Sequence, residues 1–197
     1  MLIELTGAVA AQRAAGLALQ LLKTPPAGVR DAVAAYETVA VYFDPLDCDP
    51  RELTSALLSA VTVAAVAPAV SPAHHVIPVV YDGEDLDGVT ELTGLTRTTV
   101  AELHSSTEYS VQAVGFVPGF AYLGELDERL RIPRKDTPRT RVPAGAVAIA
   151  GAHTAVYPLT TPGGWHLIGH TDVPMFDASR SPPALLATGD RVRFVPA

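Results

Sequence analysis

Apolar residues recur at helical spacing in two segments of the first third of the chain. The first segment, residues 9–23, is rich in Ala and Leu, and the Pro25-Pro26 pair ends it. The second begins at Asp49-Pro50, a suitable N-cap followed by a suitable first helical residue, and continues to Pro68. The pattern therefore predicts two amphipathic helices. Their apolar faces are formed by Ala10, Ala14, Leu17 and Leu21 in the first and by Leu53, Leu57, Val61 and Ala64 in the second.

Short apolar or alternating runs before, between and after these helices predict strands. They are residues 2–5, 28–36, 37–44 and 74–81, and the middle two are close enough to form a hairpin. The resulting order, β-α-β-β-α-β, is that of a ferredoxin-like α+β domain. We therefore expect such a domain over residues 1–82.

The pattern changes near Asp82. An acidic segment, residues 83–94, and a segment that Thr96 can cap are each expected to form a short helix. After them, glycines and prolines interrupt β-forming runs, which indicates tightly folded β structure and not a linker. We expect a second domain over residues 83–197 and an α+β fold overall. The expected strands are residues 109–117, 146–150, 154–157, 165–168 and 192–195.

Charge is distributed unevenly along the chain, which has a net charge of −7. Residues 1–114 carry 14 acidic and 5 basic side chains, a balance of −9, and residues 115–197 carry 7 acidic and 9 basic, a balance of +2. An acidic chain has no general attraction for nucleic acid. The cationic second part suits a small anion or an acidic partner.

The sequence also indicates the cellular compartment in which the protein is expected. No apolar run reaches the roughly 18 residues that a bilayer crossing needs, and the first residues lack the basic start of a signal peptide. The single cysteine, Cys48, cannot form an internal disulfide, which fits a reducing compartment. We therefore expect a cytoplasmic protein with neither a membrane nor a nucleic acid as partner.

Three aromatic residues, Phe116, Phe120 and Tyr122, surround a Pro-Gly turn. Aromatic side chains form pocket walls, but they also pack beneath loops. Both interpretations stay open at this point.

A basic segment follows, with six of the chain's 14 Lys and Arg residues between Arg129 and Arg141. Its prolines favour an extended backbone, so a solvated basic loop is one interpretation. Anion capture is the other, because Arg presents paired, planar donors that match a carboxylate or phosphate. The candidates for this role are Arg134, Arg139 and Arg141.

Histidines follow Gly-rich turns in the next stretch. His166 and His170 are four apart, but neighbouring glycines argue against a helix there. A zinc site that includes His153 would have no cysteine ligand and no HExxH motif, so we expect no metal. The chain also lacks a GxSxG nucleophile motif and the GxxxxGK[ST] and GxGxxG phosphate loops. Catalytic residues therefore stay unassigned, and we expect no cofactor bound by this chain alone.

Taken together, these stretches resemble one family. This is the family of the sporulation-kinase inhibitor KipI. Its members are also labelled the B-type subunit of 5-oxoprolinase or allophanate hydrolase subunit 1. The motifs of this chain that resemble those of the family are GFVPGFAYL, PRKDTPRTRVPAGAVAIAG, HTAVYP, TPGGWHLIGHT and GDRVRF. That family is similar to subdomains C and D of the carboxyltransferase domain in urea carboxylases. The resemblance is dense over residues 115–195.

The resemblance implies a ferredoxin-like N-terminal domain followed by a cyclophilin-like β-barrel. It also implies one subunit of a heteromeric amidohydrolase that opens 5-oxoproline to glutamate, with ATP as a cosubstrate of the assembled complex. The partners would be the C-type component, which is KipA-like and is also called allophanate hydrolase subunit 2, and the A-type component of 5-oxoprolinase. Inhibition of a sensor histidine kinase is the alternative function. Prolyl isomerase activity, a third, would rest on the barrel alone.

The chain departs from the family at three positions. The family has Ser, Gln and Arg where this chain has Ala146, His153 and His170. A hydroxyl, an amide and a guanidinium are thus replaced, which puts the substrate specificity and the activity of this chain in question. The candidate substrate-binding residues are Phe116, Phe120, Tyr122, Arg134, Arg139, Arg141, His153, Thr154, Tyr157, Trp165, His166 and His170.

Overall fold

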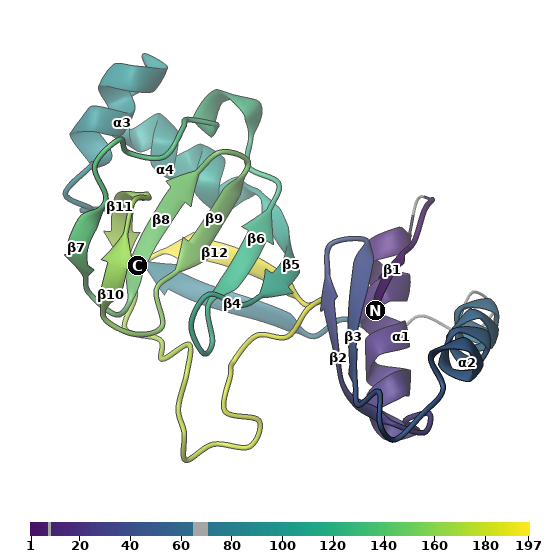
Figure 1. Ribbon diagram of the computed structural model, residues 1–197. Coiled ribbons are helices and arrows are strands. Elements are labelled where there is room, and N and C mark those ends of the chain that lie inside the picture. The colour runs from purple at the N-terminus through teal and green to yellow at the C-terminus, as the bar shows by residue number, and fades with distance from the viewer. Residues whose placement is uncertain (8, 65–70) are drawn as a thin grey trace. The chain divides into compact units, whose positions relative to one another are not determined.

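The computed structural model describes residues 1–7, 9–64 and 71–197, which form two compact units (Figure 1). The first unit is Met1–Pro72 and the second is Ala73–Ala197. Helices and strands occur in both, so the mixed α and β class expected from the sequence is confirmed.

The described residues of the first unit form an antiparallel three-stranded sheet with two helices. The middle strand, β3, pairs with β1 on one side and with β2 on the other. Helix α1 packs on β2 and β3 and buries its predicted apolar stripe, with Leu17 fully buried. The helix predicted to reach Pro68 is described as far as Ala64, and the remainder lies outside the described residues. The elements are β1 (Leu2–Glu4), α1 (Ala10–Lys23), β2 (Val29–Ala35), β3 (Thr38–Phe43) and α2 (Pro50–Ala64).

The strand expected to complete the first unit belongs to the second. This strand, β4 (His74–Val79), runs parallel to β12 (Arg191–Pro196) and pairs with it along its whole length. The division of the chain therefore falls between Pro72 and Ala73, earlier than the boundary at residue 82 expected from the sequence. The order of elements along the chain gave no sign that the partner of β4 would be more than a hundred residues away.

The second unit is built on one long strand order: β4, β12, β5, β6, β9, β8, β11. All neighbours in it are antiparallel except β4 and β12. Backbone hydrogen bonds between Val80 and His170 join the two ends of this order. A two-stranded sheet, β7 with β10, is separate. The strands not yet delimited are β5 (Glu108–Val114), β6 (Ala121–Gly124), β7 (Arg139–Val142), β8 (Ala146–Ala150), β9 (His153–Val156), β10 (Thr161–Gly163) and β11 (His166–His170).

Strand β8 is buried on both faces, and this places it between two cores. On one face, Val147 and Ile149 join the large aliphatic core of the second unit. On the other, alanines contact a cluster of aromatic rings that includes Trp165. Along the sequence of β8, branched side chains that face the aliphatic core therefore alternate with alanines that face the aromatic cluster. The alanines of β8 and β9 on the aromatic side are Ala146, Ala148, Ala150 and Ala155.

Two helices cover other parts of this unit: α3 (Leu86–Thr93) packs on β11, and α4 (Arg97–Ser106) packs on β12 (Figure 1). As predicted, Thr96 caps α4, because its hydroxyl accepts a hydrogen bond from the Thr99 amide. A single turn of 3₁₀ helix, η1 (Glu128–Leu130), precedes the basic segment. Among the described residues, none of the helices has both the length and the apolar character that a bilayer crossing requires.

Candidate functional site

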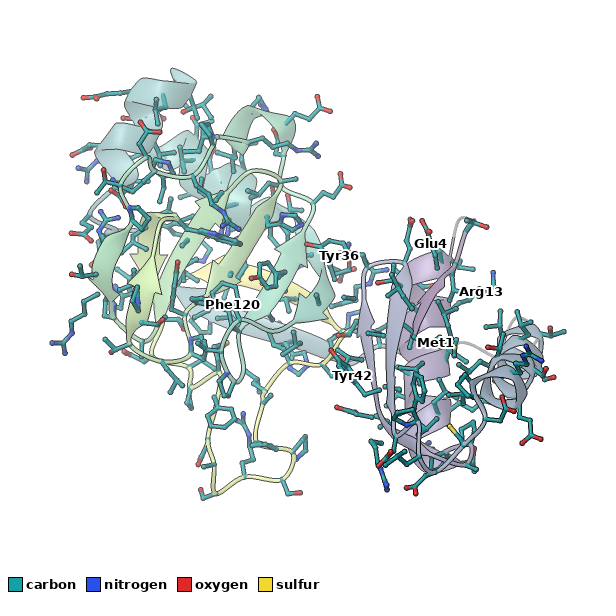
Figure 2. The ribbon with its side chains drawn as sticks, in the orientation of Figure 1. Met1, Glu4, Arg13, Tyr36, Tyr42 and Phe120 are labelled. Atoms are coloured by element: carbon teal, nitrogen blue, oxygen red, sulfur yellow. The ribbon has the colours of Figure 1, made fainter. Side chains whose placement is uncertain are left out.

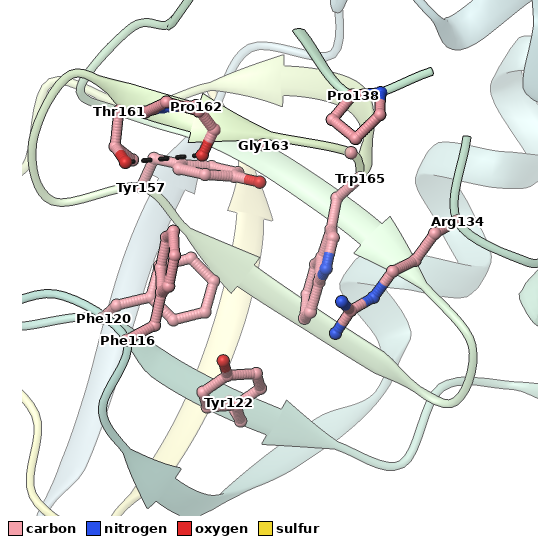
Figure 3. A pocket seen from close by; sticks show the side chains of 11 residues that line it. Phe116, Phe120, Tyr122, Arg134, Pro138, Tyr157, Thr161, Pro162, Gly163 and Trp165 are labelled. Carbon is pink, nitrogen blue, oxygen red and sulfur yellow. Dashed lines mark hydrogen bonds between the residues drawn. The ribbon is translucent and has the colours of Figure 1, made fainter. Parts of the chain in front are cut away.

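An open cavity of about 280 Å³ lies on the aromatic side of the second unit (Figure 3). Its walls come from the turn after β5, from β6, from the basic segment and from the residues around β10. Most of its lining is aromatic or proline and glycine, which suits a small ligand with an apolar surface. The lining residues are Phe116, Phe120, Tyr122, Arg134, Pro138, Tyr157, Thr161, Pro162, Gly163, Gly164 and Trp165.

Phe120, labelled in Figure 2, is the centre of this ring cluster and is almost fully buried. Its ring lies edge-on to four others, with centroid distances of 5.0 Å to Tyr122, 5.3 Å to Tyr157, 5.5 Å to Phe116 and 5.7 Å to Trp165. Such edge-to-face pairs add about 0.5–1.5 kcal/mol each beyond area burial. Alanine side chains on β8 and β9 leave room for these rings. The aromatic walls of the cavity are therefore packed against one another without a ligand.

The turn that carries Phe116 depends on glycine. Gly119 has a φ of +80°, and a Cβ there would lie 2.8 Å from the Cβ of Phe176. Phe116 itself has a φ of +75°, which is unfavourable for a side chain of this size. Phe116 is 62% exposed and its ring lines the cavity (Figure 3). The fold thus holds an exposed aromatic ring in a strained position beside the cavity.

The basic segment supplies one cation to the cavity. Four of its six cations form ion pairs: Arg129 with Asp127, Arg131 with Glu125, Lys135 with Asp85, and Arg139 with Glu84 and Asp85. Arg134 and Arg141 have no acidic partner in the part of the chain that the structure describes.

Of these two, only Arg134 lines the cavity, and its guanidinium carbon lies 5.9 Å from the centre of the Trp165 ring. The hydroxyl of Tyr122 also faces the cavity (Figure 3), and it makes no hydrogen bond within the described residues. The site therefore combines apolar walls with two donors that have no acceptor.

Close backbone approach fixes another wall. A Cβ at Gly163 would lie 2.2 Å from the hydroxyl oxygen of Tyr157, so only glycine lets β10 approach this ring. Burial raises the pKa of Tyr157, against smaller lowering effects from the Trp165 backbone and from the positive charges of Arg134 and Arg139. The phenol is therefore neutral at physiological pH.

His153 lies next to this site without lining the cavity. Its ring is half-buried and edge-on to Tyr122, with 6.3 Å between ring centroids. Burial lowers the pKa of His153, and the positive charges of Arg134 and Arg131 lower it further, against an opposing effect of Glu125. The imidazole is therefore neutral near pH 7, and it replaces the amide expected at this position of the family.

The other candidates lie outside the cavity. Nε2 of His166 donates a hydrogen bond to the Pro133 carbonyl at 3.0 Å, and Nδ1 of His170 lies 2.8 Å from Oδ1 of Asp82. His170 lines a different cavity, of about 410 Å³, with residues around Val80 and Asp172. Within the described residues no three His, Cys, Asp or Glu side chains gather in a way that could hold a metal ion.

Thr154 is fully buried in a polar cluster that the sequence did not predict. Its hydroxyl lies 2.8 Å from Nε2 of His104, and Nδ1 of His104 lies 2.7 Å from the Tyr81 hydroxyl. The His104 ring also stacks on Phe194, with centroids 4.5 Å apart. His104 lies in the helix that Thr96 caps, and Asp85 lies in the acidic segment of residues 83–94; the sequence assigned no role to either residue. Neither residue type carries a local signal for burial.

Comparison with known proteins identifies the family. A family model described as "Carboxyltransferase domain, subdomain C and D" matches residues 1–186. The chain belongs to this family. The B-type subunit of 5-oxoprolinase from Escherichia coli O157:H7 is 57% identical over 123 residues, which are 61% of this chain and 56% of that protein. This chain therefore spans about half the length of the curated relatives it matches.

Two solved structures extend the similarity to the whole chain. TTHA0988 is 42% identical with a TM-score of 0.88, and the match covers 100% of this chain and 39% of TTHA0988. PH0987 from Pyrococcus horikoshii is 36% identical with a TM-score of 0.62, and the match covers 100% of this chain and 93% of PH0987. Together with the family match, these similarities confirm the resemblance found in the motifs.

Proposed function

We propose that this protein is one subunit of a heteromeric, ATP-dependent amidohydrolase, equivalent to the B-type subunit of 5-oxoprolinase. The observation that carries the proposal is the cavity with aromatic walls and two donors without acceptors, Arg134 and the Tyr122 hydroxyl. A small cyclic amide that carries a carboxylate, such as 5-oxoproline, has matching groups. Its ring suits the aromatic walls, its carboxylate suits the guanidinium, and its lactam oxygen suits the phenol.

The same proposal assigns a role to each candidate. Phe116, Phe120, Tyr157 and Trp165 enclose the ring of the ligand, and Arg134 binds its charge. His153 modifies the wall behind Tyr122, where the family has an amide. Arg139, Arg141, Thr154, His166 and His170 act outside the cavity in this proposal, because none of them lines it.

The cavity is open, and we propose that the KipA-like, C-type component covers it while the A-type component and ATP complete the reaction. This chain corresponds to 39% of TTHA0988, so in that protein the matching segment is joined to a much longer sequence. A segment that is fused to other sequence in one protein often associates with it as a separate chain in another. The free thiol of Cys48 supports a cytoplasmic location. No observation favours the sensor-kinase alternative.

We further propose that the two units are of the ferredoxin-like and cyclophilin-like types. In support of the first, β3 lies between β1 and β2 as in a split β-α-β arrangement. In support of the second, the Val80 and His170 bridge joins the ends of the strand order as in a barrel.

Co-expression tests the function. The tagged chain would be produced with its C-type and A-type partners, and glutamate release from 5-oxoproline would be measured with and without ATP. We expect ATP-dependent release by the complex and little by the chain alone, with a strong loss in Trp165→Ala and Arg134→Met. Arg141→Met is the matched control and should retain activity. A chain that remains monomeric beside its partners, or equal rates with and without ATP, would contradict the proposal.

A further inference from the structure

Asp85 is a buried carboxylate at the point where three separate segments meet. Its side chain is 7% exposed. One oxygen, Oδ1, accepts hydrogen bonds from Nζ of Lys135 and from Nη2 of Arg139, each at 2.6 Å. The other, Oδ2, accepts one from the Leu167 amide at 2.8 Å. A single carboxylate thus ties the basic segment to β11.

Glycine brings Asp85 to this position. At Gly83 a Cβ would lie 2.3 Å from the Leu167 carbonyl oxygen, so no larger residue permits the approach of this turn to β11. The Asp85 amide then donates to that same carbonyl at 3.0 Å. Asp85 is therefore fixed to the strand by its backbone and by Oδ2, which leaves Oδ1 to the two cations.

Both cations belong to residues 133–139, which we call the strap. The strap carries two cavity-lining residues, Arg134 and Pro138. Its backbone is held by Pro133, whose carbonyl accepts from His166, and by Lys135, whose amide donates to the Gly164 carbonyl at 2.8 Å. Lys135 directly follows Arg134 and Arg139 directly follows Pro138, and both cations contact Asp85. Asp85 therefore binds both the strap and the beginning of β11, which directly follows Trp165.

The charge of Asp85 is well supported. Burial by itself would raise the pKa of this carboxyl, but the hydrogen bonds from Arg139, Lys135 and the Leu167 amide outweigh it and lower the pKa. Glu84 forms a second, largely exposed ion pair with Nε of Arg139. Asp85 is thus ionised at neutral pH and, together with Glu84, balances the charges of Lys135 and Arg139, which are then less available to compete with Arg134 for an anion.

We infer that Asp85 is a positioning residue for the ligand site: it holds the strap where Arg134 faces Trp165, and so determines how well the cavity binds a carboxylate. The identity of the ligand rests on the function proposed above, but the positioning role does not. Asp85 touches no ligand in this inference and acts only through Arg134 and Pro138.

The first test needs no ligand, because Trp165 is the only tryptophan in the chain. Acrylamide quenching of its fluorescence reports how well the strap covers the ring. We expect Asp85→Asn in the full chain to raise the quenching constant about twofold, because the strap loosens. Asp190→Asn is the matched control: Asp190 is 14% exposed and accepts from two backbone amides and His75, but none of its partners lies in the strap. Unchanged quenching in Asp85→Asn, or an equal rise in both variants, would overturn the inference.

The second test uses 5-oxoproline and 2-pyrrolidinone, the same lactam without the carboxylate, titrated against Trp165 fluorescence. Asp85→Asn should weaken 5-oxoproline binding about tenfold and leave 2-pyrrolidinone nearly unchanged, because a charge-assisted contact is lost. In an Arg134→Met background Asp85→Asn should have no further effect on 5-oxoproline. Equal losses for both lactams, or a full loss in the Arg134→Met background, would show a merely structural role and refute the inference.

These outcomes are separable from those of the proposed function. If 5-oxoproline fails to bind the wild-type chain, the proposed substrate is wrong, and the quenching result still decides the role of Asp85. If Asp85→Asn does not fold, Lys135→Met replaces it, since this half-exposed cation is one of the two at Oδ1. We expect the same changes at smaller size, and no change in quenching by Lys135→Met would then overturn the inference.

Discussion

Two sites in the second unit differ in whether their hydrogen-bonding groups find partners within the chain. One is the cluster of His104, Tyr81 and Thr154, and the other is the aromatic cavity. In the cluster, the Thr154 hydroxyl donates to the Ala148 carbonyl at 3.0 Å, so it must accept from Nε2 of His104. Nδ1 of His104 then accepts from the Tyr81 hydroxyl. Every donor has its acceptor, and one arrangement of protons satisfies the whole cluster.

The cavity has the opposite property, since the Arg134 guanidinium and the Tyr122 hydroxyl face open space without acceptors in the described residues. A buried polar group without a partner lowers the stability of the fold. A polar group at an open cavity instead forms hydrogen bonds with water until a ligand replaces that water. The difference teaches how to separate structural from functional residues here. A polar residue whose hydrogen bonds are all satisfied by the chain holds the fold, and one with unused donors beside a cavity is available for binding.

Removing β4 should break the cluster most severely. A chain of residues 83–197 lacks Tyr81 and the whole of β4, including Ile77 and Val79, which are both 1% exposed. It leaves one edge of β12 unpaired and Nδ1 of His104 without a donor. We expect residues 73–197 to melt cooperatively and residues 83–197 not to, as measured by circular dichroism. Equal melting of both would show that β4 is dispensable.

The next largest effect is expected for His104→Ala. This change leaves a cavity in the core and deprives both Tyr81 and Thr154 of a partner, so it should destabilise the chain by about 3–5 kcal/mol. Urea unfolding monitored by far-UV circular dichroism measures the change. A loss below about 1 kcal/mol would mean that the cluster is not the structural site described above.

Acid should weaken the same cluster. Burial lowers the pKa of His104 from an ordinary 6.5 to about 3. Between these values the unfolded chain binds a proton that the folded chain does not, so stability falls as the pH falls from 6.5 towards 3 and is unaffected by this group above 6.5. At pH 5 the loss should be about 2 kcal/mol relative to pH 7. His104→Phe is the control, and its free energy of unfolding should fall less over this range. Parallel curves for the two proteins would contradict the assignment.

The sequence predicted much of the local structure for physical reasons that can be named. The stripe of α1, the apolar run of β8 and the Thr96 cap depend on neighbours a few residues apart, so apolar patterns and capping rules detect them. The partner of β4 and the burial of His104 depend on contacts across most of the unit. Local patterns contain no information about those contacts.

The same limit applies within the candidate site. Arg134 and Arg139 are equivalent by sequence, since both lie in one extended basic segment. Arg139 forms two ion pairs because Asp85 and Glu84, more than fifty residues earlier, are brought against it, whereas Arg134 is left at the cavity. The sequence left two interpretations open for the aromatic residues, and the structure places Phe120, Tyr157 and Trp165 in one ring cluster that also lines the cavity.

The smallest effect on stability is expected for Arg134→Met. Because Arg134 has no acidic partner among the described residues, its loss should change the free energy of unfolding by less than about 0.5 kcal/mol. It should nevertheless reduce affinity for 5-oxoproline about tenfold. Arg141→Met, an exposed cation on β7 outside the cavity, should change neither quantity. If Arg134→Met lowered the free energy of unfolding as much as His104→Ala does, Arg134 would also stabilise the fold, and the proposed difference between the two sites would be wrong.

The place of β12 in the sheet also sets the order in which the protein can fold. This strand lies between β4 and β5, yet residues 191–196 are synthesised long after both of them. The strand pairings described for the first unit all lie within residues 2–43, so this unit can fold on the ribosome while the rest of the chain emerges. The central sheet of the second unit must wait for its last strand, so its folding is late and dominated by contacts distant in sequence, which makes it slow. Until then, the facing edges of β4 and β5 are exposed, and it is at this stage that the nascent chain is most open to aggregation.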